Sequence, residues 1–164
     1  MAAVLQNPVA DPMLLVDQSG GVATLTLNRP AQYNVLSAGM MDALQAEFER
    51  IAADPAVRVV VLAAAGKAFC AGHDLREMRA EPALAYYQAL FAQCSRLMTT
   101  LQALPQPVIA RVQGVATAAG CQLVAMCDLA VAARDARFAV SGINGGLFCS
   151  TPGVGLSRNL QRKA

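Results

Sequence analysis

Hydrophobic positions in this chain follow two periods that alternate along the sequence. Residues 22–27 read Val-Ala-Thr-Leu-Thr-Leu, and this alternation predicts a β-strand. Residues 37–53 place apolar side chains three or four positions apart, which predicts a helix that Asp54-Pro55 stops. Residues 57–63 are continuously apolar and rich in β-branched side chains, which is typical of a strand buried on both faces.

The same alternation continues through the second half of the chain. A turn-rich loop over 67–74 precedes a long helical pattern over 82–104. Two more apolar runs, 108–112 and 129–133, predict buried strands, and a helical run over 119–126 separates them.

Strands that alternate with helices predict an α/β layered fold with right-handed crossovers. We expect a flexible lead-in over residues 1–12 and a single domain over 13–164. The last part of that domain, 138–160, is rich in Gly and Ser.

Composition narrows the classes of partner. With 164 residues the chain is long enough for one domain with a real core. The formal net charge of +2 is too small to indicate binding to nucleic acid or to an anionic membrane. No apolar run has membrane-spanning length, so we expect no membrane partner.

The cysteines and the single histidine argue against a metal centre. Five cysteines occur without a C-x-x-C pair, and only one His is present. Reduced, mostly buried thiols are therefore expected. Residues 1–12 contain no Lys or Arg, which argues against a secretory or transit peptide and favours a cytoplasmic location.

Four sequence blocks resemble the motifs of the enoyl-CoA hydratase/isomerase (crotonase) family, in that family's order and at its spacing. In finer detail, two stretches resemble the subgroup called enoyl-CoA hydratase domain-containing protein 3, namely 118–124 and 144–154. The four blocks are Leu27-Asn28-Arg29-Pro30 with Asn34-Val35-Leu36-Ser37, then Phe69 to Leu75, then Pro107 to Asp128, and finally Ser150 to Gly155.

The resemblance implies a crotonase-like (ClpP/crotonase) spiral of β-β-α units with two roughly perpendicular sheets wrapped by helices. It implies that acyl-CoA binds in a bent shape, with no cofactor beyond the coenzyme A moiety of the substrate. Family members usually continue into C-terminal helices that cover the acyl pocket and build a trimer or hexamer. The chain is therefore expected to stop before those helices, with its homo-oligomeric state open.

The family holds the thioester oxygen with two backbone N–H groups. By position, the resemblance assigns these to His73 and Ala119. The residues support this assignment, because residues 118–120 open a helix and leave the N–H of Ala119 without an intrahelical acceptor. Small side chains here could alternatively serve only close helix–strand packing.

Residues around the first of these donors resemble the stretch that contacts the adenosine and pantetheine parts of CoA. The imidazole of His73 could act as a general base, although the family uses this position for its backbone. Asp74 is expected to cap the following helix. Arg29 and Arg76 could meet CoA phosphates or simply carry solvated charge. The expected CoA-binding residues are Arg29, Ala71, Gly72, Asp74, Leu75 and Arg76.

The two Glu residues of the family's hydratases are missing. Their positions are Gln122 and Gly142, neither of which can transfer a proton. No Asp or Glu occurs in 82–127 or after residue 135. The remaining polar candidates for the acyl site are Glu77, Glu81, Tyr86, Tyr87, Ser141, Asn144 and Cys149.

Three functions stay open. The first is a hydratase/isomerase-type enzyme of fatty acid metabolism that stabilises an enolate and uses another acid or base. The second is a non-catalytic acyl-CoA-binding or regulatory protein, which the absent Glu pair favours. The third, a purely structural or partner-binding domain, leaves the retained loops unexplained.

Overall fold

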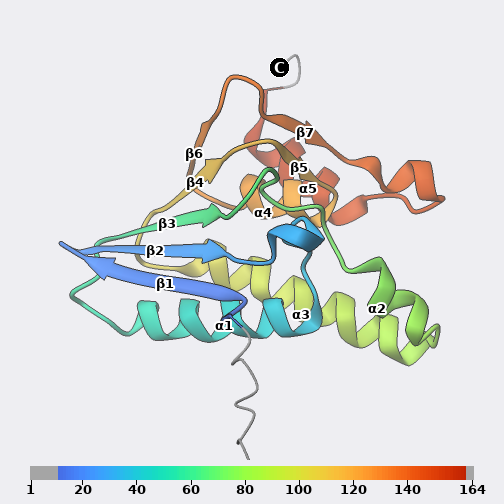
Figure 1. The fold of residues 1–164 in the computed structure, drawn as a ribbon, viewed down its shortest axis with the longest axis horizontal. Coiled ribbons are helices and arrows are strands. Elements are labelled where there is room, and N and C mark those ends of the chain that lie inside the picture. The colour runs from blue at the N-terminus through green and yellow to red at the C-terminus, as the bar shows by residue number, and fades with distance from the viewer. Residues whose placement is uncertain (1–10, 162–164) are drawn as a thin grey trace, which may run out of the picture.

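A five-stranded sheet organises the chain in the computed structural model, which describes residues 11–161 (Figure 1). Its strands lie in the order β1-β2-β3-β4-β6. β1 and β2 form an antiparallel hairpin, and β2, β3, β4 and β6 run parallel. The strands are β1 (Leu14–Ser19), β2 (Val22–Leu27), β3 (Val59–Ala64), β4 (Val108–Val112) and β6 (Leu129–Ala132).

Two long helices, α1 (Ala38–Ala52) and α3 (Leu84–Ala103), pack side by side beneath this sheet (Figure 1). The α1 helix begins where the sequence predicts, because the Ser37 hydroxyl accepts a hydrogen bond from the Met40 N–H at 3.1 Å. Apolar side chains of both helices, such as Phe48 and Leu97, are fully buried with those of β2 and β3 in one core.

A second, smaller layer carries the later part of the chain. β5 (Val115–Thr117) pairs in parallel with β7 (Arg137–Ala139), and two helices that contact each other accompany them. These helices are α4 (Ala119–Ala125) and α5 (Ser150–Asn159). The remaining short elements are η1 (Pro30–Gln32), α2 (Leu75–Ala80) and η2 (Ser141–Gly145).

Most predicted elements are present, but part of one prediction lies outside the described residues and the structure contains strands that were not predicted. The expected lead-in falls largely on residues 1–10, which lie outside the described residues. β1 was not expected, because only Leu14 of its six residues is buried and its pattern therefore lacks a period of two. β5 was not expected either, because a three-residue strand is too short to show a period.

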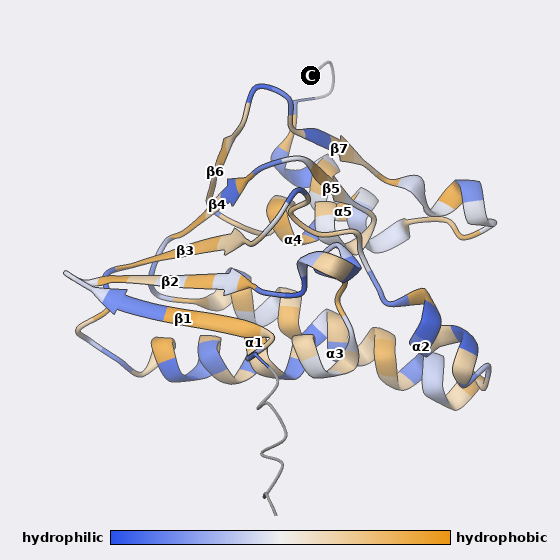
Figure 2. Ribbon diagram, viewed as in Figure 1, coloured by the Kyte–Doolittle hydropathy of each residue, from blue (hydrophilic) through white to orange (hydrophobic). Residues whose placement is uncertain are grey.

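The sequence predicts a buried strand at 129–133; a strand is present there, but the prediction that it is buried is wrong. β6 forms, but all four of its residues are exposed, including Leu129 at 61% and Val131 at 64%. Figure 2 shows hydrophobic colour along this outermost strand. The strand has a neighbour on one side only, so its apolar side chains lack the second layer that a central strand receives.

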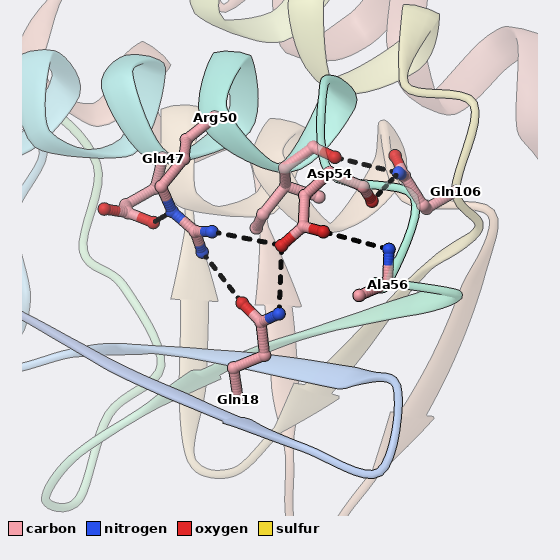
Figure 3. Close-up of polar contacts among 7 residues, drawn as sticks. Gln18, Glu47, Arg50, Asp54, Ala56 and Gln106 are labelled. Carbon is pink, nitrogen blue, oxygen red and sulfur yellow. Dashed lines mark hydrogen bonds and ion pairs between the residues drawn. The ribbon is translucent and has the colours of Figure 1, made fainter.

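A polar cluster ties the C-terminal end of α1 to the sheet (Figure 3). Asp54 accepts hydrogen bonds from Gln18 Nε2 at 3.0 Å and from Ala56 N–H at 2.9 Å, and it pairs with Arg50 at 3.5 Å. These contacts, the Gln18 bond first, lower the pKa of Asp54. Gln106 completes the cluster from the turn before β4, donating to the carbonyl of Ile51 at 2.8 Å.

We expect Gln106→Ala to lower the free energy of unfolding by about 0.5–1.5 kcal/mol, because the substitution removes one buried hydrogen bond to the Ile51 carbonyl, which keeps its bond from the Asp54 N–H. Chemical denaturation measures the change. The matched control is Gln102→Ala, which removes the same side-chain type from an exposed position four residues earlier. Equal effects of the two substitutions would contradict the structural role of Gln106.

Candidate functional site

Two segments far apart in the sequence meet at the start of α4. The backbone N–H groups of Phe69 and Cys70 donate to the Val115 carbonyl, and Thr117 N–H donates to the Cys70 carbonyl at 3.0 Å. Gly120 packs so closely that a Cβ there would lie 2.3 Å from the Cys70 carbonyl oxygen. Only glycine permits this approach, so residue 120 fixes the first loop against the helix.

Asn34 holds the first loop from its other side. Its side chain is fully buried and donates to the carbonyls of Ala65 at 2.8 Å and Ala68 at 2.9 Å. Its carbonyl oxygen accepts from the Arg29 N–H at 2.8 Å. In the sequence, Asn34 stands out only as part of a motif. Its bracing role depends on carbonyls more than thirty residues away, which no local pattern reveals.

The two backbone donors expected from the resemblance come together at this junction. Among residues 11–161, neither the His73 N–H nor the Ala119 N–H has a hydrogen-bond acceptor. Gly72 directly precedes His73 and lies against the second donor, since a Cβ at Gly72 would be 3.3 Å from the Ala119 nitrogen. Gly72 has φ +92°, a conformation that glycine adopts without strain. Both donor residues line one cavity of about 930 Å³.

Ala118 stores backbone strain next to the second donor. Its φ of +50° and ψ of −123° lie where glycine is strongly preferred. A non-glycine residue held in such a conformation costs roughly 1–3 kcal/mol. The surrounding contacts maintain it, since Ala118 N–H donates to the Ala139 carbonyl at 2.9 Å.

The cavity is lined by apolar side chains together with a few polar ones. Apolar contributors include Val35, Phe91 and Phe148, and two cations, Arg76 and Arg79, also line it. Ala71, Asp74 and Leu75 also line the cavity, and their expected contact with CoA stays a prediction.

Two of the expected CoA-binding residues lie elsewhere. Gly72 is buried behind the cavity wall and shapes it through its backbone. Arg29 is not among the residues that line the cavity, and its Nη1 donates to the carbonyls of Asp11 and Asn28 at 3.0 and 2.9 Å. Contact between Arg29 and a CoA phosphate stays a prediction.

The imidazole of His73 packs edge-on against Phe91, with ring centroids 5.5 Å apart. Burial lowers the pKa of His73, and a hydrogen bond with the Leu36 backbone acts in the opposite direction. Its Nδ1 is buried without a partner among the described residues. A neutral imidazole at pH 7 follows, because burial disfavours the charged form.

The carboxylates near the cavity are engaged in structural roles. Asp74 accepts from the N–H groups of Arg76 and Glu77 at 2.8 and 3.4 Å and so caps α2, as predicted. Glu77 accepts from the Ala38 N–H at 3.0 Å, at the start of α1. Within residues 11–161, Asp74 is the only carboxylate that lines the cavity.

The two positions of the absent Glu pair both line the cavity. Gln122 is 4% exposed, and its Oε1 accepts a hydrogen bond from the Thr151 hydroxyl at 3.1 Å. Gly142 lies in η2, where a Cβ would be 2.6 Å from both the Leu147 carbonyl oxygen and Cys149 Sγ. The chain therefore has room for a long side chain at the first position and not at the second.

Burial raises the pKa of four cysteine thiols, namely those of Cys70, Cys94, Cys121 and Cys127. All five cysteines are free, and burial raises the pKa of Cys70 and Cys127 to about 12 and that of Cys94 to about 11. The described part of the chain contains no group of three or more His, Cys, Asp or Glu residues placed to hold a metal ion. Among residues 11–161, no helix is long and apolar enough to cross a membrane.

Comparisons with known proteins agree with the motifs. The family model described as enoyl-CoA hydratase/isomerase matches residues 17–164. The mitochondrial enoyl-CoA hydratase domain-containing protein 3 of Xenopus laevis is 49% identical over 152 residues, which make up 93% of this chain and 52% of that protein. The resemblance to this subgroup is thereby confirmed.

Two solved structures confirm the expected crotonase-like fold. An enoyl-CoA hydratase from Mycobacterium smegmatis aligns with a TM-score of 0.91 at 68% identity, covering 93% of this chain and 60% of the other. The human enoyl-CoA hydratase domain-containing protein 3 aligns with a TM-score of 0.88 at 43% identity over the same shares.

The chain spans about half the length of the curated relatives it matches. The family match nevertheless covers the loops, the α4 terminus and the cavity described above. The chain belongs to the enoyl-CoA hydratase/isomerase family.

Proposed function

We propose that this chain binds acyl-CoA thioesters and holds the thioester oxygen between the N–H groups of His73 and Ala119. The observation that carries the proposal is the pairing of these donors. They come from different loops, neither has an acceptor among residues 11–161, and both residues line the same cavity. Two backbone donors left without acceptors at a cavity wall favour a ligand oxygen, since such groups are otherwise paired.

The chemistry that follows is stabilisation of an enolate. When an acyl-CoA loses a proton at its α-carbon, negative charge develops on the thioester oxygen. Preorganised N–H donors stabilise that charge, and removal of one such donor typically costs about 3 kcal/mol. Gly72 and Gly120 preorganise the pair by allowing the two segments to approach closely.

Cations at the cavity suit the phosphates of coenzyme A. Arg76 and Arg79 lie on α2 and line the cavity from there. Guanidinium groups bind phosphate with charge-assisted, often bidentate hydrogen bonds.

A trimeric or hexameric assembly and a cytoplasmic location stay predictions, and the curated relatives named above are described as mitochondrial.

Efficient hydration is not part of the proposal. General acid–base catalysis contributes on the order of 100- to 10,000-fold, and it needs a side chain that can transfer a proton. The cavity offers Gln122 and Gly142 where such acids are expected, and its one carboxylate, Asp74, caps α2. This shortage favours, as a second candidate, a non-catalytic acyl-CoA-binding or regulatory protein.

We expect the thioester oxygen to contribute measurably to binding. Butyryl-CoA should bind about three- to tenfold more tightly than S-butyl-CoA, the thioether that lacks this oxygen, because one or two net hydrogen bonds are lost. Isothermal calorimetry at equal ionic strength measures both dissociation constants. Absence of butyryl-CoA binding at millimolar concentration would overturn the proposed function, and equal affinities would overturn the role of the two donors.

Hydration of crotonyl-CoA is expected to be at least about a thousandfold slower than in a competent hydratase, because the acid–base pair is absent. Gln122→Glu should raise the rate, since its side chain already reaches the cavity. Gly142→Glu should not add to this gain and should lower the melting temperature, because its Cβ would meet the Leu147 carbonyl and Cys149. A normal hydration rate in the unmodified chain contradicts this expectation.

Stability is expected to fall on acidification below about pH 6.5, in part through His73. The folded chain lowers the pKa of this imidazole, so the unfolded chain binds the proton first. The His73 contribution is therefore complete above the unfolded pKa and is lost as pH falls toward the folded pKa. Denaturation at pH 7.5 and 5.5 should show a smaller pH effect in His73→Gln; an unchanged effect excludes the imidazole as its source.

A further inference from the structure

His73 brings a second group to the cavity besides its backbone N–H. Its side chain lines the same cavity as Ala119, where the ring meets Phe91 of α3 edge-on. The proposed binding of the thioester uses only the backbone of this residue and leaves the imidazole without a role. No other residue can substitute for this ring, because the sequence contains a single histidine.

The two ring nitrogens of His73 differ in their access to a ligand. Nδ1 is buried, and no described residue lies at hydrogen-bonding geometry to it. Nε2 is not sealed in this way, and the residue that carries it lines the cavity. Nε2 is therefore the nitrogen that a bound ligand can reach.

The backbone of Leu36 favours the ring form that has a lone pair at Nε2. Leu36 is fully buried and pairs with His73 in an isolated β-bridge, so it lies on the sealed side of the ring. Its N–H already donates to the Gly72 carbonyl at 2.8 Å, which leaves its own carbonyl, an acceptor, to face a ring N–H. Burial lowers the pKa of His73, and the interaction with Leu36 raises it, as an acceptor does. A neutral ring with its proton on the Leu36 side can accept a proton at Nε2.

The other titratable groups of the cavity are less suited to take a proton from carbon. Asp74 accepts two backbone N–H groups at the start of α2, and the Tyr87 hydroxyl donates to the Met78 carbonyl at 2.8 Å. Burial raises the pKa of Cys94 to about 11, which keeps this thiol protonated at pH 7. Besides His73, the titratable and charged residues that line the cavity are Asp74, Arg76, Arg79, Tyr87, Cys94 and Cys149.

The reach of the ring fits the expected place of the thioester. The α-carbon of an acyl-CoA is two bonds, roughly 2.4 Å, from the thioester oxygen. An oxygen that accepts from the His73 N–H therefore holds the α-carbon close to the side chain of the same residue. A general base must come within hydrogen-bond reach of the proton that it removes.

We propose that the imidazole of His73 is the base that removes the α-proton of the bound acyl-CoA. Nε2 takes the proton, the electron pair of the C–H bond forms the C=C bond of the enolate, and the carbonyl π pair moves to the thioester oxygen. The imidazolium then returns a proton to the same carbon, so no other reactant is needed. One residue thus supplies an oxyanion donor through its backbone and a catalytic base through its side chain. The inference rests on the proposed binding of the thioester at His73 and Ala119.

The test measures exchange of the α-protons of butyryl-CoA with deuterium in D₂O, by mass spectrometry. The chain should catalyse this exchange, and His73→Gln should slow it at least about 100-fold, because the base is lost. The dissociation constant of butyryl-CoA should change much less, since glutamine keeps the backbone N–H. The control variant Gln102→Ala changes an exposed residue outside this cavity and should keep the original rate.

Chemical modification tests the same group without a substitution and serves if His73→Gln fails to fold. Diethyl pyrocarbonate acylates accessible imidazole nitrogens, and this chain offers only one imidazole. The reagent should modify His73 and stop the exchange, butyryl-CoA should slow the modification, and hydroxylamine should restore the activity. A histidine that the reagent does not reach in the folded chain would contradict the access assigned to Nε2.

The pH dependence separates a base from a residue that only packs. The exchange rate should fall as pH drops through the pKa of His73, which burial places below its ordinary value of 6.5. Proton NMR of the single histidine ring gives that pKa independently, and the two midpoints should coincide. Midpoints that differ by more than about one pH unit would assign the proton transfer to another group.

The possible outcomes distinguish this inference from the proposed function. If butyryl-CoA does not bind, the proposed function fails and this inference fails with it. If butyryl-CoA binds and its α-protons exchange no faster than in buffer, only the inference is overturned. Exchange that survives both His73→Gln and diethyl pyrocarbonate also overturns it.

Discussion

The close backbone contact between the first loop and the start of α4 is the constraint on which the site depends. Gly120 lets the Cys70 carbonyl approach the helix, and Gly72 lets the loop turn beside Ala119. Hydrogen bonds from residues 69, 70 and 117 fasten the same junction. Because each free N–H belongs to a different segment, the pair exists only while this contact is maintained. Strain at Ala118 is tolerated for the same reason, since several contacts over-determine its conformation.

Polar groups around the cavity divide into those that the fold uses and those that it leaves available. Asn34, Asp74 and Glu77 have their hydrogen bonds committed to loop carbonyls and helix N-termini. The N–H groups of His73 and Ala119 have no acceptor among residues 11–161, and both are donors. The available groups therefore suit a ligand rich in oxygen, and the cavity lacks a carboxylate free to move protons within the described residues.

Local sequence patterns determined much of the fold and the location of the candidate site. Period-two and period-3.6 patterns predicted β2, β3, β4, α1 and α3, because buried faces impose those spacings directly. The glycine-rich loop, the small residues that open α4 and the lack of acids in 82–127 and after 135 are also properties of the sequence alone. Together with the motif order, they were sufficient to identify the family.

Only the tertiary structure decided how these pieces act together. β6 is exposed because it lies at the edge of the sheet, and a run of apolar residues in the sequence does not indicate that position. The diversion of Arg29 to backbone carbonyls and the bracing by Asn34 depend on partners distant in the sequence, as does the steric block at Gly142. The hydrogen bond between the Gln122 side chain and Thr151 likewise joins residues twenty-nine positions apart. A residue's type can be read from the chain, but which of its atoms remain free follows from contacts that only folding creates.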